Sequence, residues 1–217
     1  MRKLFEIGGM VAAVVLIAFG LGAMVLGING RSTVRDSLKL EQIVGSDNMT
    51  PAAIATEAKE AGLPASLALP TVDLAGKPID TGERARDFAS YMRIHTLELT
   101  GGLTYSQMGR FLSAADPADP AGTSDATAAL MDAKGSPVPN AARNTWVTET
   151  ALTTALNTSY MAEQTALFGI VVGIALLLSG FGFAIFAIGG ALRNPETALG
   201  FVRSRPKKNI KAPLPIA

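Results

Sequence analysis

Two long apolar runs flank a polar middle in this chain of 217 residues. The second run, 166–192, contains 27 residues without a charged side chain, and the first, 7–28, contains 22. A helix of about 20 apolar residues spans the hydrocarbon core of a bilayer, and lipid forces the backbone to satisfy its own hydrogen bonds. The pattern predicts an all-α membrane protein in which two transmembrane helices, 7–28 and 166–192, flank a mainly helical domain, 29–165.

Two helices are predicted early in the middle region. Thr50 is a suitable N-cap, Pro51 suits the first helical position and Gly62 suits the end of a helix over 50–62. A second helix, from about 83 to 100, has apolar positions that recur every three or four residues. These positions are Ala85, Phe88, Met92, His95 and Leu99. They predict a single buried face.

The rest of the middle is less regular. Thr104 and Gln107 form a capping-box pattern that predicts a shorter helix through Leu112, so that two helices form a corner around Gly101–Gly102. Residues 113–142 contain four prolines and four aspartates among small residues, which predicts a disordered, mobile insertion. The aspartates lack the spacing of a calcium loop. Residues 143–165 contain no Gly or Pro, which predicts a helix continuous with the second span.

Several alternatives stay open near the spans. Residues 31–45 could form a helix or an extended arm. The first apolar run could be an uncleaved signal anchor or a cleaved signal peptide, and the length of the run favours the anchor. Gly22 lies four residues after Ala18, and Gly169 and Gly173 form a GxxxG pattern. Such spacing lets another helix approach closely, but glycine is also common in membrane helices that pack against nothing there.

Charge is distributed unevenly although the whole chain has a net charge of +1. The middle carries 11 basic and 16 acidic residues, a net charge of −5, whereas the ends carry 8 basic and 2 acidic residues, a net charge of +6. Basic residues beside a span favour the cytoplasmic side. The pattern predicts a plasma-membrane protein whose termini, 1–6 and 193–217, are both cytoplasmic. The absence of cysteine excludes disulfides and thiol chemistry.

His95 is the only histidine, with Glu98 one helical turn later, Asp87 two turns earlier, and Tyr91 nearby. His95 and Glu98 could form a proton relay or half of a metal site, or His95 could simply pack on the apolar face. Because one histidine and one carboxylate are too few for a site, the packed role is favoured. The Gly101–Gly102 pair could bind an anion, but a helix C-cap explains it fully.

The candidate functional corner therefore comprises His95, Glu98, Gly101, Gly102 and Tyr105. No catalytic, cofactor-binding or metal-ligating residue is predicted within it. The chain also has no phosphate-binding loop, nucleophile elbow or zinc-protease motif.

The segment FASYMRIHTLELTGGLTYSQMGRF, residues 88–111, resembles part of a group of two-span actinobacterial membrane proteins, as does NTWVTETALTTALNTSYMAEQ before the second span. Their shared feature is His-x-Leu-Glu-x-Thr-Gly-Gly-x-Thr-Tyr, here His95 to Tyr105. The resemblance implies an extracytoplasmic position for this motif. Some members are labelled aromatic ring-opening dioxygenases. Non-haem iron oxygenase sites use two histidines and a carboxylate, and this chain has one histidine, so the label does not suit it.

The architecture favours a non-catalytic accessory, scaffolding or assembly protein of the bacterial plasma membrane or cell envelope. The alternative is a membrane-tethered extracytoplasmic sensor or ligand-binding domain that uses the corner around His95, and an enzyme comes third. The expected partners are the lipid bilayer and either another membrane protein or further copies of the chain. No nucleic-acid partner and no cofactor is predicted.

Overall fold

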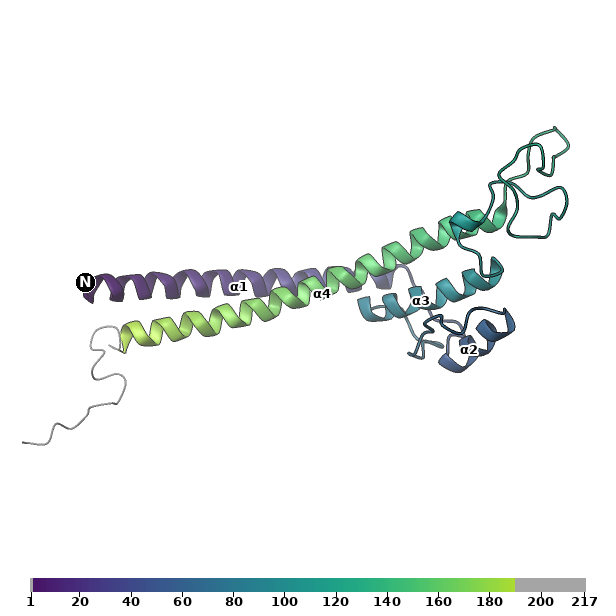
Figure 1. Ribbon diagram of the computed structural model, residues 1–217. Coiled ribbons are helices and arrows are strands. Elements are labelled where there is room, and N and C mark those ends of the chain that lie inside the picture. Colours follow the sequence, from purple (N-terminus) through teal and green to yellow (C-terminus); the bar gives the residue numbers. More distant parts are fainter. Residues whose placement is uncertain (1, 190–217) are drawn as a thin grey trace, which may run out of the picture. The chain divides into compact units, whose positions relative to one another are not determined.

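A computed structural model describes residues 2–189 of the chain (Figure 1). Its helices are α1 (Arg2–Leu40), α2 (Pro51–Glu60), α3 (Gly82–Leu99) and α4 (Ala141–Ile188), with a short 3-10 turn at Tyr105–Gln107. Within residues 2–189 no β-strand forms, and isolated bridges are the only β-type pairing. The predicted all-α class is confirmed for this range. The predicted basic tail, 193–217, lies outside the described residues.

By length and composition, α1 and α4 are both able to cross a membrane. The predicted run 7–28 lies wholly inside α1, and the predicted run from 166 lies inside α4 as far as Ile188. Residues 31–40 continue α1, so the segment 31–45, which could be a helix or an extended arm, is helical over most of its length. As predicted, α4 begins before the apolar run and passes into it without a break.

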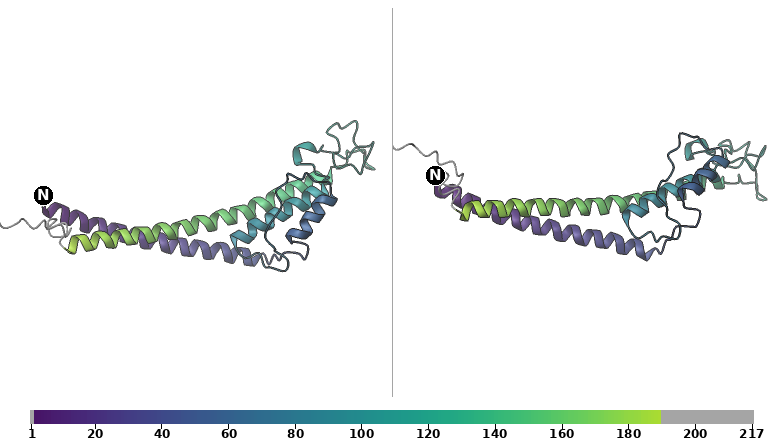
Figure 2. Two further views of the ribbon diagram at one scale, coloured as in Figure 1. Left: turned by 60° about the horizontal axis from the view of Figure 1, so that its bottom comes forward. Right: turned by 90° about the horizontal axis from the view of Figure 1, so that it is seen from below.

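The described chain divides into two compact units, which we describe separately. The first contains α1 up to Val25 and α4 from Ile170. These two helix segments lie antiparallel, with the start of α1 and the end of α4 at the same end of the unit (Figure 2).

Small residues bring the two helices of the first unit together. A Cβ atom added to Gly173 would lie 2.6 Å from Met24 Cγ and 2.8 Å from the Gly20 carbonyl oxygen, so only glycine fits there. Two turns further towards the end of α4, a Cβ atom on Gly180 would lie 2.7 Å from Ile17 Cγ1. Such close approach increases dispersion contacts between helices in an apolar medium.

The packing face of α1 contains Gly20 rather than the predicted Gly22. Two residues along a helix correspond to about 200° of rotation, so Gly22 lies on the far side, and a Cβ atom there meets no described atom within 4 Å. The predicted Gly173 lies at the closest approach, whereas Gly169 belongs to the second unit, where it is half-buried.

The second unit, Leu26–Gly169, contains a hydrophobic core to which every described helix contributes. Its buried members include Leu38 of α1, Ile54 of α2, Phe88 and Tyr91 of α3, and Leu156 of α4. Here α2 and α3 lie side by side (Figures 1 and 2). This shared core holds the facing side chains of α2 and α3 in place.

Threonine side chains cap the starts of both helices, and Thr50 is the cap that the sequence predicts. Thr50 Oγ1 accepts a hydrogen bond from the Ala53 amide at 3.2 Å at the start of α2, and Thr81 Oγ1 accepts one from the Arg84 amide at 3.3 Å at the start of α3. Each bond satisfies an amide that has no partner within its helix. Gly62, with a φ of 66°, follows the end of α2, which is a conformation that glycine adopts without strain.

The buried surface of α3 is wider than the predicted single face. Leu99 is 70% exposed, whereas Tyr91 and Ile94, which lie off the predicted face, are buried. The reason is that α3 has neighbours on two sides, with α2 along one side and α4 along another. At the α4 side the backbones come so close that a Cβ atom on Gly82 would lie 2.8 Å from Tyr160 Cα.

The predicted helix over 104–112 is wrong, although its capping box forms. The Thr104 amide donates to Gln107 Oε1 at 2.8 Å, but helical structure ends at Gln107. From Gly109 on, the backbone pairs with the following loop instead: the Gly109 amide donates to the Ala121 carbonyl at 2.7 Å and the Phe111 amide to the Thr123 carbonyl at 2.9 Å. These long-range bonds compete with a local helix.

The predicted insertion, 113–142, has a defined course built from turns. Its backbone forms bridges such as Ser113 to Ala129 and Met131 to Pro137. The buried Asn140 side chain ties the end of the insertion to the residue Gly109 before it and to its interior, because its amide donates to the carbonyls of Gly109 at 3.2 Å and Pro120 at 2.9 Å. The mobility of this segment stays a prediction, because hydrogen bonds between exposed turns do not measure motion.

Limited trypsin digestion is expected to cut after Lys134 before any other site in the second unit. Lys134 is exposed on a turn of the insertion, where few apolar side chains are buried. Lys59, which is also exposed but lies within α2, is the matched comparison. Cleavage after Lys59 at the same rate would contradict the prediction of a mobile insertion.

Candidate functional site

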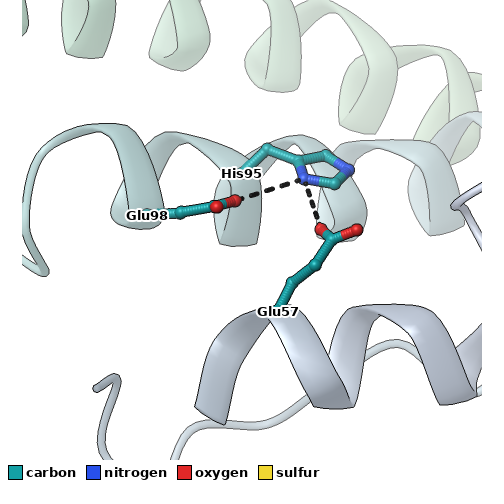
Figure 3. Close-up of side chains that lie close together, drawn as sticks. All are labelled: Glu57, His95 and Glu98. Atoms are coloured by element: carbon teal, nitrogen blue, oxygen red, sulfur yellow. Dashed lines mark ion pairs between the residues drawn. The ribbon is translucent and has the colours of Figure 1, made fainter. Parts of the chain in front are cut away.

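The structure divides the predicted corner into two places. His95 and Glu98 lie near the end of α3 on the side that meets α2 (Figure 3). Tyr105 lies instead against α4, with the Arg143 guanidinium 4.0 Å from its ring centroid. Together with Trp146 and Val147, Tyr105 lines an apolar groove on this part of α4. The structure therefore keeps His95 and Glu98 together and places Tyr105 apart from them.

Gly101 and Gly102 end α3 and turn the chain. Both have positive φ angles, 61° and 79°, and the Gly102 amide donates to the Leu97 carbonyl at 2.7 Å. This bond satisfies one of the carbonyls left free at the end of a helix. The C-cap explanation of the glycine pair accounts for this geometry without an anion.

Glu57 of α2 is the partner of His95 that sequence analysis missed. Its Oε2 atom lies 3.2 Å from His95 Nδ1, while Glu98 Oε2 lies 4.0 Å from the same nitrogen. Figure 3 shows both carboxylates on the Nδ1 side of the imidazole ring, with the other ring nitrogen pointing away. The ligand-type atoms of all three side chains lie within 4.8 Å of one another. Because α2 and α3 are far apart in sequence, spacing within one helix could not reveal this set.

The three side chains differ in how they are held. His95 is 21% exposed and Glu57 is 25% exposed, whereas Glu98 is 45% exposed and reaches solvent. Glu57 Oε1 accepts a hydrogen bond from Asn48 Nδ2 at 3.0 Å, and Asn48 in turn accepts one from Ser46 at 2.6 Å. This chain of polar contacts orients the Glu57 carboxylate toward His95. A protonated imidazole would form an ion pair here, and a neutral one offers a ligand nitrogen.

Asp87 and Tyr91 lie near His95 in sequence but face other surroundings. Asp87 lines a cavity with Glu83, Arg86 and Tyr160. Burial raises the pKa of the Asp87 carboxyl, the Glu83 charge adds to this effect, and Arg86 opposes it. The Tyr91 hydroxyl donates to the Val72 carbonyl at 2.8 Å, and burial raises the pKa of this phenol.

A second polar cluster, which sequence analysis also missed, is centred on Glu163 of α4. Its Oε1 atom accepts from Arg31 Nε at 2.9 Å and lies 2.7 Å from Arg35 Nη2. Its Oε2 atom accepts from the Gly82 amide at 2.6 Å, at the start of α3. Glu163 is the last acidic residue before the second apolar run, and Arg31 and Arg35 are one turn apart just after the first. Opposite charges at matching positions beside the two apolar runs were therefore the sequence signal for this ion pair.

Comparison with protein-family models, curated proteins and solved structures finds no match for this chain. The resemblance to the two-span actinobacterial group therefore stays a prediction.

Proposed function

We propose that this protein spans the plasma membrane twice, with both termini in the cytoplasm and the unit Leu26–Gly169 outside. The apolar lengths of α1 and α4 support insertion. The antiparallel arrangement of the first unit puts the start of α1 and the end of α4 at the same end, which suits two termini on one side (Figure 2). The net charge of +6 at the ends and −5 in the middle supports the cytoplasmic side for the termini.

Within this topology we assign the protein a non-catalytic accessory, scaffolding or assembly role in the membrane or envelope. One observation carries this proposal, namely the cluster of polar contacts around the buried Glu163. Glu163 is bound at the same time by two arginines of α1 and by the first amide of α3. Glu163 thus ties α1, α3 and α4 together within the unit Leu26–Gly169, which suits a rigid part that holds other components in position.

Two experiments test this role. First, after gentle cross-linking and extraction in mild detergent, the full chain should bring down a membrane protein in a fixed stoichiometric ratio. Second, deletion of the gene should lower the amount of that partner's assembled complex on native gels, and either the natural chain or a His95→Gln variant should restore this amount. Unchanged complexes after deletion would contradict the accessory role.

A second function has a specific observation in its favour. The convergence of Glu57, His95 and Glu98 supports a membrane-tethered sensor or ligand-binding domain. This alternative predicts the opposite outcome for His95→Gln, which would then fail to restore the phenotype of the deletion although it folds and accumulates normally.

A further inference from the structure

The geometry points to a divalent transition-metal site formed by Glu57, His95 and Glu98, with Zn²⁺ as the representative ion. The three residues provide one imidazole nitrogen and two carboxylate oxygens within 4.8 Å of one another. This inference is independent of the accessory role, since it concerns only the surface between α2 and α3.

The distances suit a small divalent ion. Zinc binds imidazole nitrogen and carboxylate oxygen at about 2.0–2.2 Å, so two ligands of a tetrahedral centre lie about 3.4 Å apart. The distance from His95 Nδ1 to Glu57 Oε2, 3.2 Å, is close to this value. The distance from Nδ1 to Glu98 Oε2, 4.0 Å, is somewhat longer, but the Glu98 side chain is 45% exposed and can change its rotamer.

The contact between His95 and Glu57 is short but is not a hydrogen bond. Glu57 Oε2 is buried and accepts no hydrogen bond from any group among residues 2–189, although His95 Nδ1 lies 3.2 Å away. Two ligands of one ion lie at such a distance without a hydrogen bond between them. An ion there would also satisfy the buried oxygen.

Helix packing and a hydrogen bond hold His95 and Glu57 in place. His95 and Glu98 are one turn apart on α3, and Glu57 belongs to α2, which packs on α3 through the core of the second unit. The bond from Asn48 Nδ2 to Glu57 Oε1 fixes the other oxygen of that carboxylate. Hydrogen bonds of this kind orient the ligands of metal sites. Imidazole with carboxylates suits zinc and neighbouring first-row ions, and water would complete the coordination.

Zinc binding by the full chain in detergent tests this site, with a purification tag that contains no histidine. Equilibrium dialysis against Zn²⁺ should give one bound ion per chain, and Co²⁺ should give a visible ligand-field spectrum. His95→Gln, Glu57→Gln and Glu98→Gln should each weaken zinc binding at least tenfold. Glu60→Gln removes an exposed carboxylate from the same helix α2 and should leave binding unchanged. Asn48→Ala should weaken binding by about 10–100-fold through loss of orientation.

A measurement on the natural chain complements the variants. Because His95 is the only histidine in the sequence, carbethoxylation of imidazole by diethyl pyrocarbonate reports on this residue alone, and Zn²⁺ should slow it. Zinc should also raise the melting temperature of the natural chain but not that of His95→Gln, since an ion that binds the folded state stabilises it. No zinc binding, binding that survives in His95→Gln, or equal loss in Glu60→Gln would overturn the proposal.

Discussion

Glu163→Ala is expected to destabilise the second unit by about 3 kcal/mol, the lower end of the cost of removing one partner from a buried ion pair. Glu163 is buried, so its loss leaves the Gly82 amide without its acceptor and two guanidinium groups without their counter-charge. The lower end applies because the side chains of Arg31 and Arg35 are 41% and 36% exposed and can turn to water. Denaturant unfolding in detergent, followed by circular dichroism, measures the change.

Two variants serve as controls for this prediction. Glu163→Gln keeps one oxygen acceptor and should lose less stability than Glu163→Ala, because the Gly82 amide can still be satisfied. Glu41→Ala removes an exposed carboxylate just beyond the end of α1 and should stay within about 0.5 kcal/mol of the natural chain. Equal stability of Glu163→Ala and Glu41→Ala would show that the cluster does not hold α1, α3 and α4 together.

Phe88→Ala is expected to be the most damaging single truncation in α3, with a loss of about 3–5 kcal/mol. Phe88 is 8% exposed and belongs to the core shared by α2, α3 and α4. Removing the ring leaves a cavity that the surrounding helices can fill only in part. Thermal or denaturant unfolding of the full chain provides the measurement.

His95→Gln is the comparison for Phe88→Ala, and without added metal it should stay within about 1 kcal/mol of the natural chain. Glutamine keeps a hydrogen-bonding group beside Glu57 and much of the imidazole volume. Partner association should also stay near that of the natural chain. A His95→Gln protein that is stable but entirely without cellular activity would refute this expectation and favour the sensor function.

Local signals in the sequence predict the helices well. Thr50 and Thr81 are recognisable N-caps because the side chain that satisfies the free amide lies within three residues of it. The lengths of the apolar runs and the absence of Gly and Pro before residue 166 likewise predict α1 and α4. In each case the interacting groups are neighbours along the chain.

Features that depend on distant parts of the chain are not predictable in this way. The partners of His95 and Glu163 come from other helices, so neither set is visible as a spacing. The helix expected up to Leu112 fails because the Gly109 and Phe111 amides bond to a loop that the composition describes only as polar. The choice of Gly20 over Gly22 depends on how far α1 is rotated toward α4, which small-residue spacing alone does not fix.

Accessibility of single cysteines tests the proposed topology most directly, because the natural chain contains no cysteine and gives no background. The cells are intact, but the part of the envelope outside the plasma membrane is made permeable to the reagent. A thiol reagent that cannot cross the plasma membrane should then label Lys134→Cys. It should label Lys3→Cys and Lys208→Cys only after the plasma membrane is opened. Labelling of Lys3→Cys or Lys208→Cys in intact cells, with Lys134→Cys protected until opening, would contradict cytoplasmic termini and an external domain.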